Sequence, residues 1–138
     1  MDALYTAVAT ANGREGRAVS SDGQIDLALA FPPALGGDGK GTNPEQLFAA
    51  GYAACFASAM GNVARAMKLD IEDVSVTAEV SIGKDPSDGG FGIGVVMHVE
   101  LPEHLEGEVG ERLVEQTHAA CPYSKATRGN IPFEIVIE

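Results

Sequence analysis

A helix-forming segment that begins at Asn43 and continues to about Lys68 constrains the fold of this chain most strongly. Asn43 offers an N-cap, Pro44 suits the first helical position, and Gln46 stands three residues after the cap, as in a capping box. The apolar run Leu47–Met60 is rich in alanine and is shorter than the roughly 20 residues that cross a bilayer. We therefore predict a long, buried, central helix of a soluble fold, against which another backbone packs closely.

Strand candidates precede this helix. Residues 3–10 and 24–31 are rich in β-forming side chains, and the turn-forming pairs Asn-Gly at 12–13 and Asp-Gly at 22–23 separate them. This pattern predicts an antiparallel hairpin or meander. Residues 32–42 are so rich in glycine and proline that they predict a loop leading into the helix.

Two strands, a helix and a last strand are expected after the long helix. Val74–Ile82 and Phe91–Leu101 show period-two alternation and predict a hairpin. Apolar residues recur near helical spacing over Leu105–Ala120, and Pro122 ends that run. Phe133–Glu138 closes the chain as a strand. The order ββ–α–ββ–α–β predicts an α+β fold, with antiparallel sheets around the central helix.

Length and charge narrow the class of protein further. At 138 residues the chain matches the size of one domain, so we predict a single domain over residues 1–138. The formal net charge of −11 argues against nucleic acid and membranes as partners, because both bind basic surfaces. The first residues, MDALYTAVAT, lack the basic and apolar segments of a signal peptide, and we expect a cytoplasmic protein.

The two cysteines, Cys55 and Cys121, are candidates for chemistry. In a reducing compartment they are not expected to form a permanent disulfide, and they are too few for a zinc site made of cysteines alone. Each could instead be inert core packing, since free cysteine is often buried as a small hydrophobe. A reactive thiol needs a nearby cation that lowers its pKa from about 8.5. Taken singly, each cysteine favours packing, and the residues permit a reactive dithiol without requiring it.

The three histidines, His98, His104 and His118, show no metal-ligand spacing, and we expect no metal. His118 lies one turn before Cys121, which permits a Cys/His pair. The pattern favours a surface histidine on an amphipathic helix instead.

Two segments change the balance for the cysteines. TNPEQLFAAGYAACF at 42–56 and HAACPYSKATRGN at 118–130 resemble the signature segments of the organic hydroperoxide resistance (Ohr) branch of the Ohr/OsmC family. NGREGRAVSSDG at 12–23 and GGFGIGV at 89–95 extend the resemblance, in matching order, over essentially the whole chain. The CPYS string favours the Ohr branch over its osmotically inducible relatives.

The resemblance implies a role for four residues. Cys55 matches the peroxidatic cysteine of the family and Cys121 its resolving cysteine. Arg14, in the NGREG segment, and Glu45, in the TNPEQ segment, match an ion pair that lies beside the reactive sulfur. We expect a four-residue site made of these side chains.

Physical chemistry makes these roles reasonable. Arg14 would favour the thiolate at Cys55 and orient the peroxide oxygens with its planar fork. Glu45 would hold that guanidinium by a charge-assisted pair. Arg17 and Arg128 are rival cations, and only the match of Arg14 to the first arginine of its segment separates it from Arg17.

The resemblance further implies a thiol-dependent peroxidase that reduces organic hydroperoxides, such as alkyl and fatty-acid hydroperoxides, to alcohols. Cys55 would pass through a sulfenic acid to a disulfide with Cys121, and a dithiol such as dihydrolipoamide or a lipoylated protein would reduce that disulfide. No bound cofactor is expected. The resemblance also implies a role in oxidative-stress defence and an Ohr/OsmC-like fold in an intertwined homodimer, with both chains contributing to each site.

Two alternatives stay open at this stage. One is a peroxidase of the osmotically inducible (OsmC) type, with similar chemistry but another peroxide preference and reductant. The other is a non-catalytic module that binds an apolar or lipoyl-bearing ligand, with both cysteines serving as packing.

Overall fold

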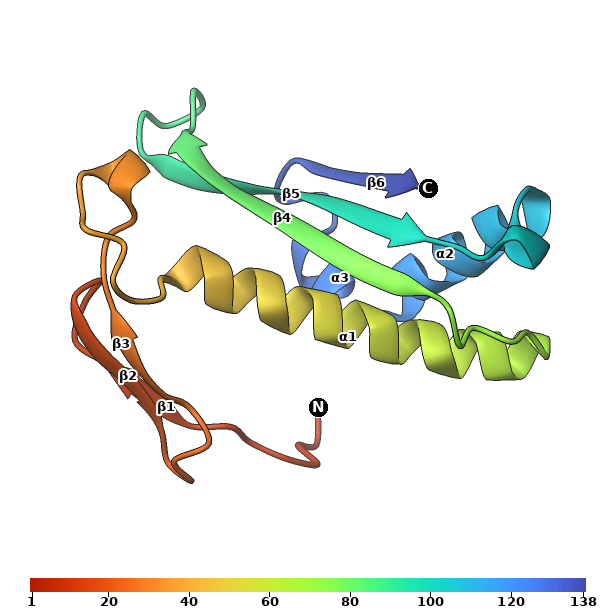
Figure 1. The fold of residues 1–138 in the computed structure, drawn as a ribbon, viewed down its shortest axis with the longest axis horizontal. Helices are drawn as coiled ribbons and strands as arrows, with labels where there is room; N and C mark the ends of the chain where they lie inside the picture. Colours follow the sequence, from red (N-terminus) through yellow and green to blue (C-terminus); the bar gives the residue numbers. More distant parts are fainter. The chain divides into compact units, whose positions relative to one another are not determined.

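The structure, a computed structural model, describes residues 1–138. Along the chain the strands and helices are β1 (Ala9–Ala11), β2 (Gly16–Ser20), β3 (Asp26–Leu29), α1 (Pro44–Met67), β4 (Ser75–Lys84), β5 (Phe91–Glu100), α2 (Glu108–Ala120), α3 (Pro122–Thr127) and β6 (Phe133–Ile137) (Figure 1). The fold class is α+β, as predicted. Two compact units make up the chain, Met1–Leu47 and Phe48–Glu138. That they form one domain stays a prediction.

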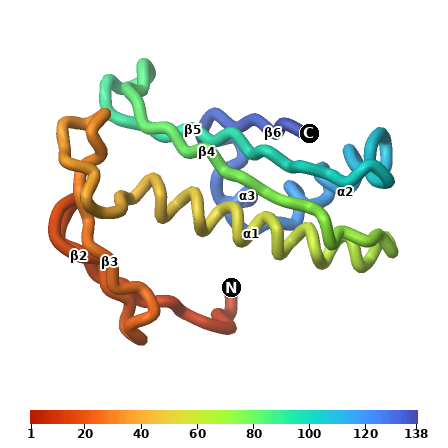
Figure 2. The backbone as a smooth tube through the Cα atoms, in the orientation of Figure 1, coloured from red at the N-terminus to blue at the C-terminus, as the bar shows by residue number.

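The first unit contains a three-stranded antiparallel meander in the order β1-β2-β3, whose trace can be followed in Figure 2. The expected turns at 12–13 and 22–23 are present, and Gly23 has the left-handed φ of 75° that its turn requires. The predicted strand bounds were wrong. The register of β1 with β2 ends with Ala9 opposite Ser20, with one further backbone hydrogen bond from Ser21 to Val8, and residues 3–8 lie outside the strand.

The start of α1 follows the capping prediction in part. The Asn43 side chain accepts a hydrogen bond of 2.8 Å from the backbone N–H of Gln46, as an N-cap should. The Gln46 side chain does not complete a capping box, because it accepts a hydrogen bond of 2.8 Å from the Thr42 hydroxyl instead. Backbone hydrogen bonds from Thr42 to Ala28 and from Ala30 to Thr42 tie the end of the loop to β3. The loop itself contains one 3-10 turn at Pro33–Leu35.

In the second unit, β4, β5 and β6 lie side by side as one sheet, with α1 running along it (Figure 1). β4 and β5 form the predicted antiparallel hairpin, with Val76 opposite Val99. The expectation of purely antiparallel sheets was wrong, because β6 pairs in parallel with β5. A parallel neighbour needs a crossover connection, and α2 with α3 supplies it.

A hydrophobic core fills the second unit. On α1 the buried residues recur every three or four positions and so share one helix face. On β5 every second residue over Val95–Val99 is buried, as the alternation predicted. The core comprises Tyr52, Phe56, Ala59, Met60, Ala64, Val95, Met97, Val99, Leu101, Leu105, Leu113, Val114 and Cys121.

The opposite face of α1 is not buried, contrary to the prediction of a helix covered all round. Ala50, Ala54, Ala57 and Ser58 are exposed, because the sheet of this unit covers only one side of the helix. By length and composition alone, α1 could cross a membrane. One face of it packs in the hydrophobic core of this unit.

The chain around α2 and α3 differs in two details from the prediction. α2 begins at Glu108 rather than Leu105, because a 3-10 turn at Glu103–Leu105 is followed by Gly107 with a φ of 87°. Pro122 ends α2, as predicted, but it also begins α3, a helix that was not predicted. Proline suits the first turn of a helix as well as it ends the preceding one.

Candidate active site

The two cysteines lie together in the second unit. Cys55 is in the middle of α1 and Cys121 between α2 and α3, 66 positions away in the sequence. The thiol of Cys121 donates a hydrogen bond to the sulfur of Cys55, and their Sγ atoms are 3.6 Å apart. Both are free thiols; Cys121 is fully buried, whereas Cys55 is partly exposed.

Two helix ends fix the position of Cys121. Its backbone N–H donates a 2.8 Å hydrogen bond to the carbonyl of Thr117, which closes the last turn of α2. Its own carbonyl accepts a 2.9 Å hydrogen bond from Lys125, which forms the first turn of α3. Cys121 is thus the C-cap of one helix and the N-cap of the next.

A buried hydroxyl cluster joins α1 to α3 next to the sulfurs. The Tyr52 hydroxyl is hydrogen-bonded to the Ser124 hydroxyl at 2.8 Å and to the Thr127 hydroxyl at 3.1 Å. All three side chains are buried. None of the three was predicted, although Tyr52 lies three residues before Cys55 and Ser124 three residues after Cys121 on helical segments, a spacing that was a usable signal.

The surroundings of Cys55 disfavour its charged form. Burial raises the pKa of the Cys55 thiol; the backbone N–H of Tyr123 lowers it in part, and Cys121 raises it further. The net direction is upward. The low pKa expected of a reactive thiol therefore requires a cation in addition to these neighbours.

A cavity of about 300 Å³ opens on Cys55. Small side chains of α1 and the junction between α2 and α3 form its wall. An apolar molecule of modest size could reach the sulfur through it. The lining residues are Cys55, Ser58, Ala59, Asn62, Ala120 and Pro122.

In the first unit, Arg14 and Glu45 form a bidentate ion pair. Arg14 lies between β1 and β2, and Glu45 lies in the first turn of α1, where a negative charge is favoured. Arg14 Nη1 donates to Glu45 Oε2 at 2.8 Å, and Nη2 donates to Oε1 at 2.6 Å. The pair lowers the pKa of the Glu45 carboxyl and raises that of the Arg14 guanidinium. Both charges are thus held in one geometry.

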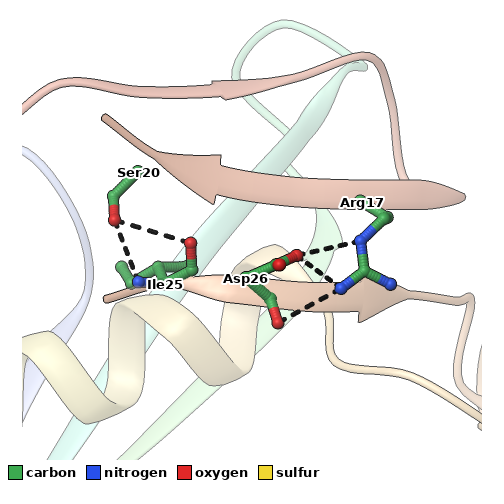
Figure 3. A network of polar contacts seen from close by, with 4 residues as sticks. All are labelled: Arg17, Ser20, Ile25 and Asp26. Atoms are coloured by element: carbon green, nitrogen blue, oxygen red, sulfur yellow. Dashed lines mark hydrogen bonds and ion pairs between the residues drawn. The ribbon is translucent and has the colours of Figure 1, made fainter. Parts of the chain in front are cut away.

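Arg17, a rival cation, is engaged elsewhere in the first unit. Figure 3 shows its guanidinium on β2 reaching across to Asp26 on β3. Arg17 Nε donates to Asp26 Oδ1 at 2.9 Å, and Nη2 donates to the same oxygen. More than half of each side chain is exposed, against 28% for Arg14 and 14% for Glu45. Of the two arginines, Arg14 has the more sheltered ion pair.

His118 is not the surface residue that the sequence predicted. Its ring stacks on Phe133 of β6 at 4.7 Å, with 11° between the planes, because this face of α2 turns towards the sheet. Its Nδ1 is buried without a hydrogen-bond partner. Burial and the charge of Arg128 lower the pKa of His118. The imidazole is therefore favoured in its neutral form. Across residues 1–138, no three His, Cys, Asp or Glu side chains are grouped as metal ligands.

Comparison with known proteins gives consistent matches. The family model "OsmC-like protein" matches residues 37–136. The organic hydroperoxide resistance protein of Xanthomonas axonopodis pv. citri is 53% identical, and the alignment covers 97% of this chain and 94% of that protein. A crystal structure of an organic hydroperoxide resistance protein from Legionella pneumophila superposes with a TM-score of 0.92 at 48% identity, over 99% of both chains. For OhrB of Bacillus subtilis the TM-score is 0.89 at 46% identity, over 99% of this chain and 100% of that one.

Proposed function

The chain belongs to the OsmC-like protein family, among relatives named organic hydroperoxide resistance proteins, and from this premise we propose that it is a cysteine-based peroxidase acting on organic hydroperoxides. The observation that carries the proposal is the 3.6 Å contact between the Sγ atoms of Cys55 and Cys121. A disulfide has an S–S bond of about 2.05 Å. Two free thiols in contact need only a modest side-chain movement to reach that distance.

In the first step, the Cys55 thiolate attacks the terminal oxygen of the hydroperoxide. The O–O bond breaks, an S–O bond forms, and the alkoxide leaves and takes up a proton to become an alcohol. The sulfur is oxidised to a sulfenic acid. Cys55 suits this role better than Cys121, because its sulfur is partly exposed and faces the cavity of about 300 Å³.

In the second step, the Cys121 sulfur attacks the Cys55 sulfenic acid. An S–S bond forms, the S–O bond breaks, and the hydroxyl leaves with a proton as water. A dithiol of the dihydrolipoyl type then reduces the disulfide by two thiol–disulfide exchanges. The burial of Cys121 fits a thiol that reacts only with its neighbour.

In this proposal Arg14 supplies the missing cation, and Glu45 holds it in place. Burial raises the pKa of Cys55, so a thiolate at neutral pH requires a positive charge beside the sulfur. The bidentate pair with Glu45 gives Arg14 a fixed orientation, which suits a group that must point at both sulfur and peroxide. We propose that Arg14 reaches Cys55 in the active protein.

The proposal extends to substrate, assembly and location. A cavity with a mainly small and apolar wall suits an alkyl or fatty-acid hydroperoxide, and a neutral substrate needs no basic surface for steering. We propose a homodimer, supported by exposed apolar residues that a partner would cover, such as Leu4, Tyr5 and Val8. We also propose a cytoplasmic role in oxidative-stress defence, without a bound cofactor.

A coupled assay tests the function. Purified protein is mixed with cumene hydroperoxide and dihydrolipoamide, and peroxide loss is followed against a protein-free control and against hydrogen peroxide. We expect rapid loss of the organic peroxide and slower loss of hydrogen peroxide. No loss above the thiol-only background would exclude the proposal, and retention of a lipoyl ligand without turnover would favour the binding module.

A further inference from the structure

We propose that the Tyr52 hydroxyl is a positioning group for the disulfide-forming step, because it anchors α3 to α1 and thereby holds the sulfur of Cys121 against that of Cys55. The inference rests on the proposed function, in which these two sulfurs react with each other. It assigns a task to a cluster that neither the sequence motifs nor the ion pair explains.

The cluster spans the two elements that carry the sulfurs. Tyr52 lies on α1, three residues before Cys55, while Ser124 and Thr127 lie on α3, three and six residues after Cys121. One phenol oxygen contacts both α3 hydroxyls, at 2.8 and 3.1 Å. A hydrogen-bonded clamp therefore stands within a turn of each sulfur.

Packing alone does not account for the hydroxyl. The Tyr52 ring stacks on Phe133 at 5.7 Å and meets Phe48 edge-on at 5.9 Å, contacts that a phenylalanine would also make. A buried hydroxyl is costly unless it is hydrogen-bonded. Here it is fully buried and has two partners on the same short helix.

α3 is the element that needs such an anchor. It has only six residues, too few to be stable as an isolated helix. Its position therefore depends on side chains that tie it to the rest of the unit. Because Cys121 is its N-cap, loosening of α3 removes one of the two helix ends that hold the Cys121 backbone and so widens the range of Sγ–Sγ distances.

The chemistry makes this distance consequential. Once Cys55 is a sulfenic acid, Cys121 can form the disulfide with release of water, or a second hydroperoxide can oxidise the sulfur to sulfinic acid with release of an alcohol. The sulfinic acid is a dead end for a simple dithiol. The partition between the two outcomes depends on how often the Cys121 sulfur is within reach.

The test is Tyr52→Phe in the full chain. We expect the step from sulfenic acid to disulfide, followed after one equivalent of cumene hydroperoxide, to slow about tenfold, as loss of two ordinary hydrogen bonds predicts. The peroxide concentration that gives half-maximal sulfinic acid should fall by a similar factor. The preceding attack on the peroxide should change less than about threefold, since Cys55 stays on α1.

Thr117→Val is the matched control. Thr117 is a fully buried hydroxyl on α2 that donates to the Leu113 carbonyl at 2.7 Å within its own helix. Thr117→Val keeps the backbone carbonyl that accepts from the Cys121 N–H, so it should lower stability without changing the partition between disulfide and sulfinic acid. If Tyr52→Phe does not fold, Thr127→Val and Thr127→Ser take its place: the first should slow disulfide formation and the second, which keeps the hydroxyl, should restore it.

Diamide separates this inference from the proposed function. This azo oxidant joins two neighbouring thiols as a disulfide without any peroxide, and is itself reduced to the hydrazine. If wild type consumes no hydroperoxide but diamide closes Cys55–Cys121 about tenfold more slowly in Tyr52→Phe, the positioning role stands and the peroxidase proposal falls. Equal rates of disulfide closure in Tyr52→Phe and wild type, with either oxidant, would overturn the inference.

Discussion

The two units of the chain differ in what they contribute. Met1–Leu47 carries the two arginine–carboxylate ion pairs, above all the bidentate Arg14–Glu45 pair, and buries few apolar side chains. Phe48–Glu138 buries a hydrophobic core and both sulfurs, but its burial of Cys55 raises the pKa of that thiol. The first unit thus holds an oriented guanidinium and no cysteine, whereas in the second unit no cation is among the groups that shift the pKa of Cys55.

Under the proposed function, this difference gives the two units complementary tasks. A sulfur in an apolar setting is protected from solvent oxidants but is a poor thiolate. A guanidinium held by a carboxylate is oriented and does not titrate in the physiological range. In the proposed function, the oriented guanidinium offsets the unfavourable effect of the apolar setting on the thiolate.

The largest expected effect lies in the second unit. Cys55→Ser should lower turnover of cumene hydroperoxide by about a thousandfold or more, because a serine hydroxyl is a far weaker nucleophile than a thiolate at neutral pH. Cys121→Ser is the control: it should consume about one equivalent of peroxide and then stall, since the sulfenic acid has no partner. Both are measured by peroxide loss per protein.

The assignment of different roles to Cys55 and Cys121 would be wrong if the two variants behaved alike. Turnover by Cys55→Ser at the wild-type rate would remove the sulfur from the mechanism. Continued turnover by Cys121→Ser would show that an external thiol resolves the sulfenic acid directly, and the buried sulfur would then be packing.

The next effect tests the contribution of the first unit. Arg14→Ala should slow the reaction of Cys55 with peroxide about a hundredfold, which is the scale of one lost electrostatic partner of a reacting group. The pKa of Cys55, followed by thiolate absorbance, should rise. Arg17→Ala is the matched control, because Arg17 forms a similar pair with Asp26 that is exposed to solvent.

One result would assign the role of Arg14 to another arginine. An unchanged thiolate titration in Arg14→Ala, together with a raised pKa in Arg17→Ala or Arg128→Ala, would assign the cation to another residue. The link between Arg14 and the sulfur would then be lost.

What could be predicted from sequence divides into local signals and tertiary contacts. The long helix, the β4–β5 hairpin and the turn at 22–23 were predictable, because capping, period-two alternation and glycine are local signals. The parallel β6 and the small helix α3 were not. Both depend on tertiary contacts, such as the hydroxyl cluster around Tyr52, that no local pattern encodes.

The candidate site divides in the same way. From the residues alone, Cys55 and Cys121 favoured packing, and only the family resemblance paired them. The structure shows a contact across 66 positions, and it shows that burial raises the pKa of Cys55. His118 was misjudged because its helix periodicity did not reveal the ring of Phe133 opposite it. The sequence therefore indicated which residues form the candidate site, but not the environment that sets their pKa values.

A smaller effect, on stability, distinguishes the charges of the first unit. Glu45→Gln should lower the free energy of unfolding at pH 7 by about 1 kcal/mol, since it weakens a partly buried, charge-assisted pair. The folded-state pKa of Glu45 is lowered, so its stabilisation is present above the unfolded value of about 4.3 and is lost as the pH falls through the folded value. Urea unfolding of both proteins at several pH values measures this.

One result would contradict the prediction for Glu45. A difference between wild type and Glu45→Gln that stays constant from pH 7 down to acid would show that the carboxylate charge contributes nothing. Glu15→Gln, at an exposed acidic residue next to Arg14 in the sequence, is the control and should leave the pH profile unchanged.

The smallest expected effect belongs to the second unit. It is a stabilisation that is lost as the pH rises, whereas that of Glu45 is lost as the pH falls. His98 on β5 is 2.7 Å from Glu138, just after β6, and 3.4 Å from Glu79 on β4, so its ring joins three strands. Glu138 first and Glu79 second raise the pKa of His98. Its stabilisation is therefore fully present below the unfolded value of about 6.5 and is lost as the pH rises through the folded value. Amide exchange in β6, compared between wild type and His98→Gln, measures the bridge.

We expect β6 protection in wild type to exceed that in His98→Gln at pH 6 and the two to converge at high pH, after correction for intrinsic exchange. Glu79→Gln should remove the smaller part of the difference, because its contact is the longer one. Equal protection of β6 at every pH would mean that the ring does not act as a charged bridge. In that case Glu45 would still make the first unit less stable in acid. The second unit would show no change in stability near neutral pH, and the two units would no longer differ in the direction of their pH dependence.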